Sequence, residues 1–178
     1  MLLAEMAHRD GKLGGLVFIS YSQPAIGEER RVAEDWAERN GYRLHVVFAN
    51  IKGVHDKMAI GVGADGLRVL PGRNLVFIGH AVNVAKAIGC DQVWYGANAD
   101  DRDYSDCTND FLQAVNHLSE MDTGVSVAAP LIRMSKAQII AKANQIGMDI
   151  DSAWSCYEPV TYMEPCGRCH SCEERHTK

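Results

Sequence analysis

The sequence predicts an α/β protein, a parallel sheet with helices on both faces, that ends in a metal-binding tail. Short apolar runs alternate with segments of helical periodicity over residues 1–150. The runs are continuously apolar, which is typical of parallel strands covered on both faces. Four of the six cysteines crowd into residues 156–172. We therefore expect an α/β domain over 1–150 and a metal-binding tail over 151–178.

The first half of the chain is expected to form helix, strand, helix and strand at residues 2–9, 15–20, 28–40 and 44–48. The first helix places leucine and methionine on one face. The second has acidic residues in its first turn and a glycine after its last, and both strands are apolar runs. Residues 51–70 are rich in glycine and lack periodicity, so we expect a loop with at most one short helix near 57–60.

The second half is expected to form helix, strand, helix, strand and helix at residues 74–89, 92–97, 108–119, 125–130 and 135–146. The first of these helices is apolar nearly all round, which predicts burial between layers. Ser135 and Gln138 form a capping box that opens the last helix. Ligands of such sheets bind where parallel strands end. The loops expected to form the site are 20–27, 49–74, 98–107 and 131–135.

The clustered cysteines have the spacing C-x9-C-x2-C-x2-C and are Cys156, Cys166, Cys169 and Cys172. A C-x2-C pair lets two thiolates reach one ion across a tight turn, and four sulfur ligands suit one structural Zn²⁺ per chain. Four thiolates leave no open position for water, so this zinc would hold the tail and not catalyse. A disulfide framework and an iron–sulfur cluster are the competing interpretations. His170 or His176 could replace one sulfur.

The net charge and the hydropathy of the sequence argue against nucleic-acid and membrane partners. A net charge of -5 argues against a dedicated polyanion-binding surface, so we expect no direct nucleic-acid partner. No apolar run approaches the length of a bilayer span, and the opening residues lack a signal sequence. Together with reduced, metal-bound thiols, these features predict a cytoplasmic protein without a membrane partner.

Short motifs follow one another along nearly the whole chain. They are Tyr21-Ser22-Gln23, Pro71-Gly72-Arg73-Asn74, Gly96-Ala97-Asn98 with Asp101, Tyr104 and Asp106-Cys107 leading to Phe111, Ala129-Pro130-Leu131 with Lys136-Ala137, and Trp154-Ser155-Cys156-Tyr157. Each alone is weak, but the set with its cysteine spacing is specific. The chain resembles the 7-cyano-7-deazaguanine synthase (QueC) family of the PP-loop ATP pyrophosphatase group.

The resemblance implies an adenine-nucleotide alpha-hydrolase-like sheet and an ATP-dependent carbon–nitrogen ligase. Such an enzyme converts 7-carboxy-7-deazaguanine and ammonia to 7-cyano-7-deazaguanine (preQ0) in queuosine biosynthesis, with ATP and Mg²⁺ as co-substrate. By analogy with the family, the chain would form a homodimer. The alternative is a non-catalytic or altered-substrate paralogue that acts as a zinc-stabilised binding module. A small zinc-ribbon binding protein fits poorly because of the long α/β body.

One departure from the family concerns ATP. Family members begin with a strand and a Ser-Gly-Gly-x-Asp-Ser loop that cradles pyrophosphate, and this sequence has neither. Because that strand is central, its loss is expected to leave two half-sheets beside an unfilled slot, each unpaired buried group costing about 1–3 kcal/mol. Total stability is only about 5–15 kcal/mol. We therefore expect that the natural amino terminus is missing, with a degenerate paralogue as the competing explanation.

The resemblance also implies the site residues. The expected catalytic residues are Arg73, Lys136 and Asp101, and the expected substrate-binding residues are Tyr21, Gln23, Asn74, Tyr104 and Asp106. The two cations begin helices, where the helix dipole adds to their charge. The aspartates match the donor edge of a purine-like ring or a Mg²⁺ ion. Solvated surface charges and loop-packing tyrosine and glutamine remain the alternatives. Cys107 is expected to be a small buried residue and not a nucleophile, because no base is identifiable beside it.

Overall fold

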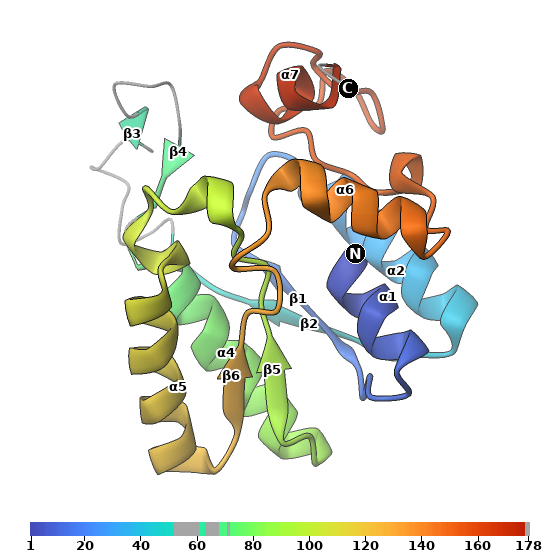
Figure 1. The fold of residues 1–178 in the computed structure, drawn as a ribbon. Coiled ribbons are helices and arrows are strands. Elements are labelled where there is room, and N and C mark those ends of the chain that lie inside the picture. Colours follow the sequence, from blue (N-terminus) through green and yellow to red (C-terminus); the bar gives the residue numbers. More distant parts are fainter. Residues whose placement is uncertain (52–60, 63–67, 71, 177–178) are drawn as a thin grey trace.

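The computed structural model describes residues 1–51, 61–62, 68–70 and 72–176 (Figure 1). The helices are α1 (Leu2–Arg9), α2 (Ile26–Asn40), α4 (Arg73–Ile88), α5 (Asn109–Thr123), α6 (Lys136–Gln145) and α7 (His170–His176). The strands are β1 (Leu16–Ser20), β2 (Leu44–Phe48), β3 (Gly61–Val62), β4 (Arg68–Val69), β5 (Gln92–Trp94) and β6 (Ser126–Ala128). Short 3₁₀ turns are η1 (Ala99–Asp101), η2 (Ser105–Cys107) and η3 (Ile150–Ser152).

The predicted α/β class is confirmed, and its parallel strands are divided into two pairs. β1 pairs with β2 in parallel, from Leu16 opposite Leu44 onward, and β5 pairs with β6 in parallel, from Gln92 opposite Ser126. Among the described strands, no pairing joins β1 to β5. The two half-sheets expected from the family comparison are therefore present.

The core lies around β5 and β6, where α4 and α5 cover the pair. Its buried residues are Ile78, Val82, Ala85, Val115, Val125 and Val127. The hydroxyl of Ser119 donates a 2.6 Å hydrogen bond to the carbonyl of Val125, which ties α5 to the start of β6. A second apolar cluster joins α1 to α6 through Leu2 and Ala143. The buried apolar residues thus form two clusters, one around β5 and β6 and one between α1 and α6.

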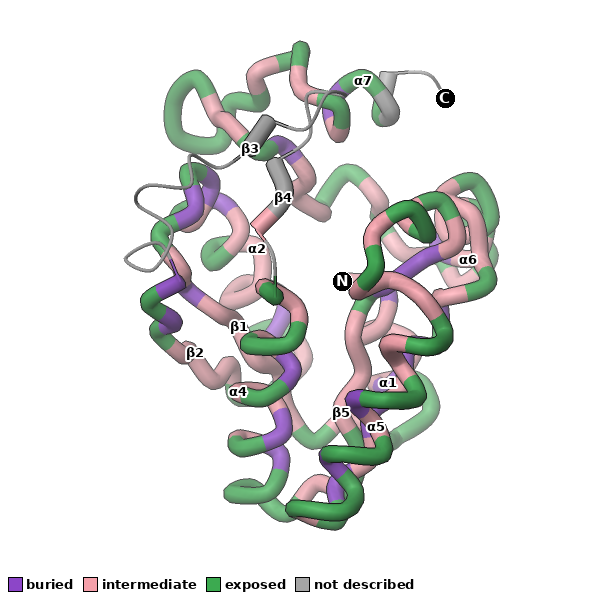
Figure 2. The backbone as a smooth tube through the Cα atoms, turned by 90° about the vertical axis from the view of Figure 1, so that its left-hand side faces the viewer, coloured by how far each residue is buried: buried purple, intermediate pink, exposed green. Residues whose placement is uncertain are grey.

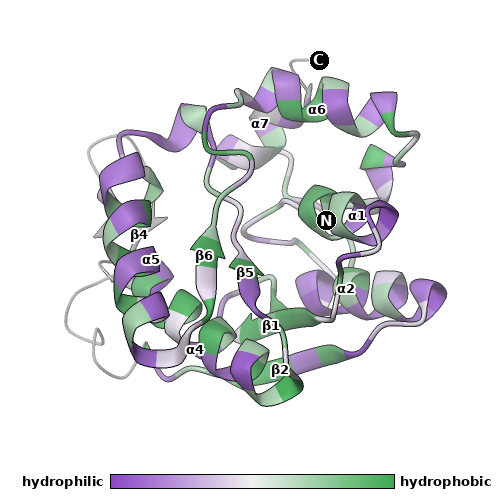
Figure 3. Cartoon of the chain, turned by 60° about the horizontal axis from the view of Figure 1, so that its bottom comes forward, coloured by the Kyte–Doolittle hydropathy of each residue, from purple (hydrophilic) through white to green (hydrophobic). Residues whose placement is uncertain are grey.

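Two burial expectations were wrong. The helix over 74–89 was expected to be buried between layers, but α4 leaves Leu75 50% exposed and is buried along a single stripe (Figure 2). β1 was expected to be covered on both faces, yet all its residues except Ser20 are only half-buried. Hydrophobic residues nevertheless fill β1 (Figure 3). The reason is a cavity beside this strand, described below.

The segment over 51–70 also differs from the expected loop, because β3 and β4 form a short antiparallel pair within it. The short helix expected near 57–60 lies outside the described residues. The capping box is confirmed: the Ser135 hydroxyl accepts from the Gln138 N–H at 3.2 Å, and the Gln138 side chain accepts from the Ser135 N–H at 2.9 Å. None of the described helices combines the length and the apolar character of a membrane span.

Candidate active site and metal centre

A cavity of about 2000 Å³ lies between the two strand pairs and extends to the loops that follow them. All eight residues expected to act in catalysis or substrate binding line this cavity, and they come from four separate stretches of the chain: the loop after β1, the start of α4, the turns after β5 and the start of α6. They are Tyr21, Gln23, Arg73, Asn74, Asp101, Tyr104, Asp106 and Lys136. The structure therefore brings the expected residues together, while the role of each stays a prediction.

Arg73 is the first residue of α4 and belongs to an aromatic cluster. Its guanidinium lies over the ring of Phe77 at 5.9 Å, and the ring of Phe77 lies 5.0 Å from that of Tyr21. Burial raises the pKa of Tyr21, and the positive charge of Arg73 partly opposes this shift. The Nε of Arg73 is buried and has no hydrogen-bond partner within the described part of the chain. A buried donor of this kind can bind an anionic oxygen.

Gln23 organises the loop after β1. Its Oε1 accepts from the Tyr21 N–H at 2.9 Å, and its Nε2 donates to Glu29 at 2.9 Å and to the Ile19 carbonyl at 3.3 Å. Glu29 also lines the cavity, and burial raises the pKa of its carboxyl group. These bonds support a positioning role for Gln23, because its amide oxygen and nitrogen already have hydrogen-bond partners within the protein.

Asp101 connects the loop after β5 to α6. Its Oδ2 accepts a 2.5 Å hydrogen bond from the Asn98 side chain, and its Oδ1 lies 3.4 Å from the Nζ of Lys136. The neighbouring Asp100 accepts from the Lys136 N–H at 2.7 Å and so adds a second cap to α6. Asn98 itself is only 8% exposed. Two loops far apart in the sequence are thus held in one geometry.

The buried hydroxyl of Tyr95 and the thiol of Cys107, which is half-buried and not buried as expected, lie near Asp106. The hydroxyl of Tyr95 is buried without a hydrogen-bond partner among the described residues. Burial, with Cys107 and Asp106 nearby, raises its pKa to about 12. Burial and the Asp106 carboxylate raise the pKa of Cys107 to about 11, so the thiol is protonated at neutral pH. This supports the interpretation that Cys107 is not a nucleophile.

The cysteine cluster has the geometry of a single-ion site. The four sulfurs lie within 4.8 Å of one another, with Cys166 and Cys172 at 4.0 Å and Cys169 and Cys172 at 3.4 Å. A tetrahedron with Zn–S bonds of about 2.3 Å requires sulfurs about 3.8 Å apart, so these residues fit the ion. All four are free thiols, so no disulfide joins them in this structure.

Backbone amides support the thiolates. The Cys169 N–H donates to the Cys166 sulfur at 3.3 Å, and the Cys166 N–H donates to the Cys156 sulfur at 3.3 Å. Backbone hydrogen bonds, first that of Arg168, lower the pKa of Cys166 to about 6. His170 begins α7 and is not in the ligand cluster, and the side chain of His176 lies outside the described residues.

The tail touches the α/β body near the cavity. The Met163 N–H donates to the buried Glu28 carboxylate at 3.4 Å, and the Arg175 guanidinium donates to the Ile150 carbonyl at 2.7 Å. Tyr157 and His170 line the cavity. The cysteine-containing tail therefore adds residues to the edge of the candidate active site.

Comparison with known proteins identifies the family of this chain. The model of the family described as "Queuosine biosynthesis protein QueC" matches residues 6–178. This chain belongs to the QueC family. Relatives include a 7-cyano-7-deazaguanine synthase from Rhizorhabdus wittichii, 37% identical over 114 residues, which are 60% of this chain and 50% of the relative. A 7-cyano-7-deazaguanine synthase from Synechococcus sp. (strain CC9605) is 38% identical over 114 residues, which are 60% of this chain and 50% of that relative.

A third relative, the 7-cyano-7-deazaguanine synthase of Chlorobium luteolum, is 28% identical over 193 residues, 98% of this chain and 84% of the relative. The chain spans about half the length of the first two relatives. The resemblance inferred from the motifs is thus confirmed at the level of the family.

Two residues that line the cavity, Glu29 and Tyr95, and one that holds Asp101, Asn98, were not expected from the sequence. Glu29 seemed an ordinary acidic residue in the first turn of a helix, Tyr95 a strand residue, and Asn98 part of a glycine-rich turn. Only Asn98 carried a usable signal, since an asparagine directly after a strand often caps the following turn. Its side chain does accept from the Asp100 N–H at 3.1 Å.

Proposed function

We propose that this chain acts as an ATP-dependent carbon–nitrogen ligase that converts 7-carboxy-7-deazaguanine and ammonia to 7-cyano-7-deazaguanine. The observation that carries the proposal is the cavity itself. Eight residues expected from the family motifs, on four separate stretches of the sequence, line one cavity in a chain of the QueC family. ATP with Mg²⁺ is the co-substrate in this proposal, and the zinc has a structural role only.

The chemistry requires activation, because a carboxylate would have to expel oxide. Attack of the substrate carboxylate on the α-phosphorus of ATP releases pyrophosphate and gives an acyl adenylate. Ammonia then displaces AMP and loses a proton to form the amide. A second adenylation on the amide oxygen lets AMP leave with loss of the remaining N–H protons, which yields the nitrile. The sum is two ATP converted to two AMP and two pyrophosphate.

Arg73 and Lys136 would oppose the negative charge that develops in both adenylations. Arg73 suits this role because its Nε is a buried donor without a partner among the described residues. Lys136 is held beside Asp101, and both side chains are about 30% exposed, so the ammonium remains accessible from the cavity.

The remaining residues would bind the ring and the metal of ATP. Asp106 and Asp101 offer carboxylates to the donor edge of a deazaguanine or to Mg²⁺. Asn74 and Tyr104 line the same cavity, and Tyr21 offers an aromatic face beside Phe77. In this arrangement Gln23 shapes the loop that presents Tyr21.

The second candidate function is a zinc-stabilised module that binds a related ligand without turnover. The residues expected to bind the ring line the cavity, and this holds whether or not ATP is turned over. Such a module would use the same cavity for the ring without forming AMP.

Two measurements on the zinc-loaded chain separate these functions. Calorimetry reports binding of 7-carboxy-7-deazaguanine, and chromatography of nucleotides reports AMP formed in the presence of this substrate, ammonia and ATP. A ligase binds the substrate and forms AMP, and Arg73→Ala lowers AMP formation at least tenfold while Arg133→Ala, an exposed arginine outside the cavity, does not. Binding without AMP supports the module. A folded chain that does not bind the substrate contradicts both functions.

A further inference from the structure

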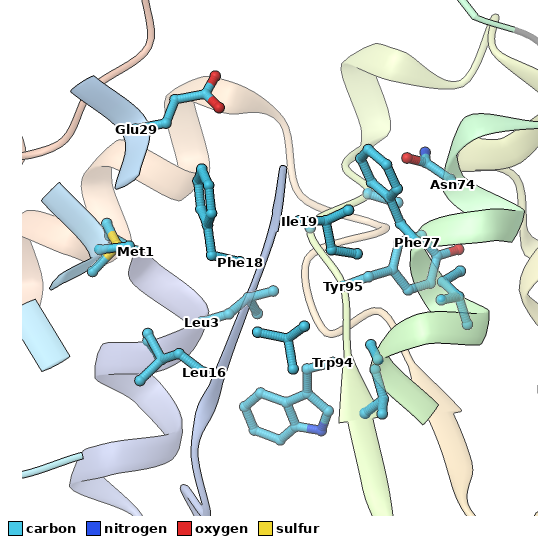
Figure 4. Close-up of a pocket in the computed structure, with 18 of the residues that line it drawn as sticks. Met1, Leu3, Leu16, Phe18, Ile19, Glu29, Asn74, Phe77, Trp94 and Tyr95 are labelled. Carbon is cyan, nitrogen blue, oxygen red and sulfur yellow. The ribbon is translucent and has the colours of Figure 1, made fainter. Parts of the chain in front are cut away.

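Glu29 lines the cavity but has no part in the two adenylations of the proposed ligase reaction. It lies in the first turn of α2, and its side chain is partly exposed. Figure 4 shows it on the opposite side of the cavity from Asn74 and Phe77, with its carboxyl group directed away from α2. A ligand in the cavity can therefore reach this carboxylate.

The negative charge of Glu29 is compensated by a single neutral donor within the described part of the chain. Its Oε2 accepts a hydrogen bond from the side-chain amide of Gln23 at 2.9 Å, and no described residue donates to its Oε1. Burial raises the pKa of this carboxyl group, the Gln23 bond and the charge of Arg73 oppose the rise, and the charge of Glu28 adds to it. A carboxylate in such surroundings attracts a cation or a proton donor.

The contacts of Glu29 favour a small cation that donates hydrogen bonds. The donor edge of a deazaguanine presents adjacent N–H groups and needs both carboxylate oxygens, but Oε2 already accepts from Gln23. Mg²⁺ needs several oxygen ligands, yet Gln23 turns its Nε2 donor toward Glu29 and its Oε1 toward the Tyr21 N–H. Ammonium needs one charged acceptor for one of its N–H groups, so the available Oε1 suits it.

Glu29 also lies near the group expected to bind phosphate. The nitrogen donor attacks the carbon that carries AMP, so the nitrogen and the phosphate must bind next to each other. Arg73 and Glu29 lie close enough for their charges to interact, and Tyr21 interacts with both. A carboxylate beside this guanidinium can thus hold ammonium next to an adenylate that the guanidinium binds.

We propose that Glu29 binds ammonium, the nitrogen donor of the ligase reaction, and removes its proton. The role rests on the proposed ligase function. The carboxylate accepts one proton from ammonium, and the nitrogen lone pair of the resulting ammonia attacks the carbonyl carbon of the acyl adenylate. The adduct loses a second proton to solvent as the bond to AMP breaks, and Glu29 returns its proton to solvent. Ammonium and the acyl adenylate thus give the amide, AMP and two protons.

The test compares two nitrogen nucleophiles on the zinc-loaded chain at pH 7, with 7-carboxy-7-deazaguanine, ATP and Mg²⁺. Ammonium is almost wholly protonated at this pH, whereas hydroxylamine is mostly neutral and needs no base before it attacks. Glu29→Gln should lower amide formation from ammonium about 100-fold or more, because a general base contributes on this order. Hydroxamate formation from hydroxylamine and the KM for ATP should change less than about threefold. Mass spectrometry measures both products.

Two controls separate this role from a structural one. The amide that replaces the carboxylate in Glu29→Gln can still accept from Gln23, so the fold should be kept, and a melting scan checks this. Glu38→Gln, exposed on the same helix and outside the cavity, should leave both products unchanged. An equal loss of amide and hydroxamate in Glu29→Gln, or no loss of either, overturns the role of Glu29.

Binding of ammonium is measured without turnover. The carbon-13 NMR signal of the Glu29 carboxyl group, assigned by its absence in Glu29→Gln, should move on addition of ammonium chloride. Tetramethylammonium chloride, which has no N–H donor, should not move it. If the parent chain forms no AMP and the signal moves, the ligase function fails while the ammonium site stands. If the signal does not move, the ammonium site is overturned whether or not AMP forms.

Discussion

The Nζ of Lys136 lies 3.4 Å from the Oδ1 of Asp101, and this ion pair joins the first turn of α6 to the loop after β5. Both side chains are about 30% exposed, so solvent screens the attraction. Its contribution to folding stability is therefore small, and its value lies in holding a cation and a carboxylate together at one rim of the cavity.

Replacement of Asp101 in this pair should change substrate affinity much more than folding stability. We expect Asp101→Asn to lower the free energy of unfolding by less than about 1 kcal/mol, because an exposed ion pair contributes little. Substrate affinity should fall about tenfold or more, since a charged hydrogen-bond partner is lost. Urea melts and calorimetry with 7-carboxy-7-deazaguanine measure the two effects. Asp122→Asn, exposed and outside the cavity, is the matched control, and unchanged affinity in Asp101→Asn would remove Asp101 from the site.

The cysteine cluster should hold one zinc per chain. Elemental analysis of the purified protein is expected to find zinc, and Cys156→Ser should lose it and lower the melting temperature, because the bound ion stabilises the folded tail. Cys90→Ser, outside the cluster, should retain the metal. Iron in place of zinc, or full zinc in Cys156→Ser, would contradict the assignment.

Cys107 should react slowly with alkylating reagents. Burial and Asp106 raise its pKa to about 11, so the reactive thiolate forms only as the pH approaches that value. At pH 8 the thiolate fraction is about 100-fold below that of a thiol with a pKa of 9. Iodoacetamide labelling of the zinc-loaded Cys90→Ser protein, followed by mass spectrometry across pH, measures this. Asp106→Asn removes a negative charge, lowers the pKa of Cys107 and should speed labelling. Rapid labelling at pH 8 in the parent protein would restore Cys107 as a candidate nucleophile.

Tyr95→Phe should have opposite effects on stability and binding. The Tyr95 hydroxyl is buried without a partner among the described residues, so its removal should leave the melting temperature unchanged or raise it. If the hydroxyl contacts the substrate, affinity for 7-carboxy-7-deazaguanine should fall up to about tenfold. A melting scan and calorimetry on the same sample compare the two. Lower stability with unchanged affinity would mean that the hydroxyl serves packing only.

Local signals predicted local structure well. The Ser135 and Gln138 capping box and the glycine after α2 depend on neighbours within a few residues, and both are present. The burial of α4 could not be predicted, because a helix that is apolar nearly all round does not indicate which face meets the core. The exposure of Leu75 was therefore not predicted.

The site was predictable only in part. Family motifs brought Arg73, Asp101 and Lys136 to attention, and these residues do share one cavity. Glu29 and Tyr95 were missed because their burial depends on contacts between segments distant in the sequence. No pattern of neighbouring residues distinguishes such positions from ordinary helix and strand residues.

The helix α4 touches β1 on one side and β5 on the other, and Arg73 is its first residue. Because α4 contacts a strand of each pair, a shift of either pair would displace the whole helix. The position of the Arg73 guanidinium at the rim of the cavity therefore depends on how the two strand pairs pack against this one helix.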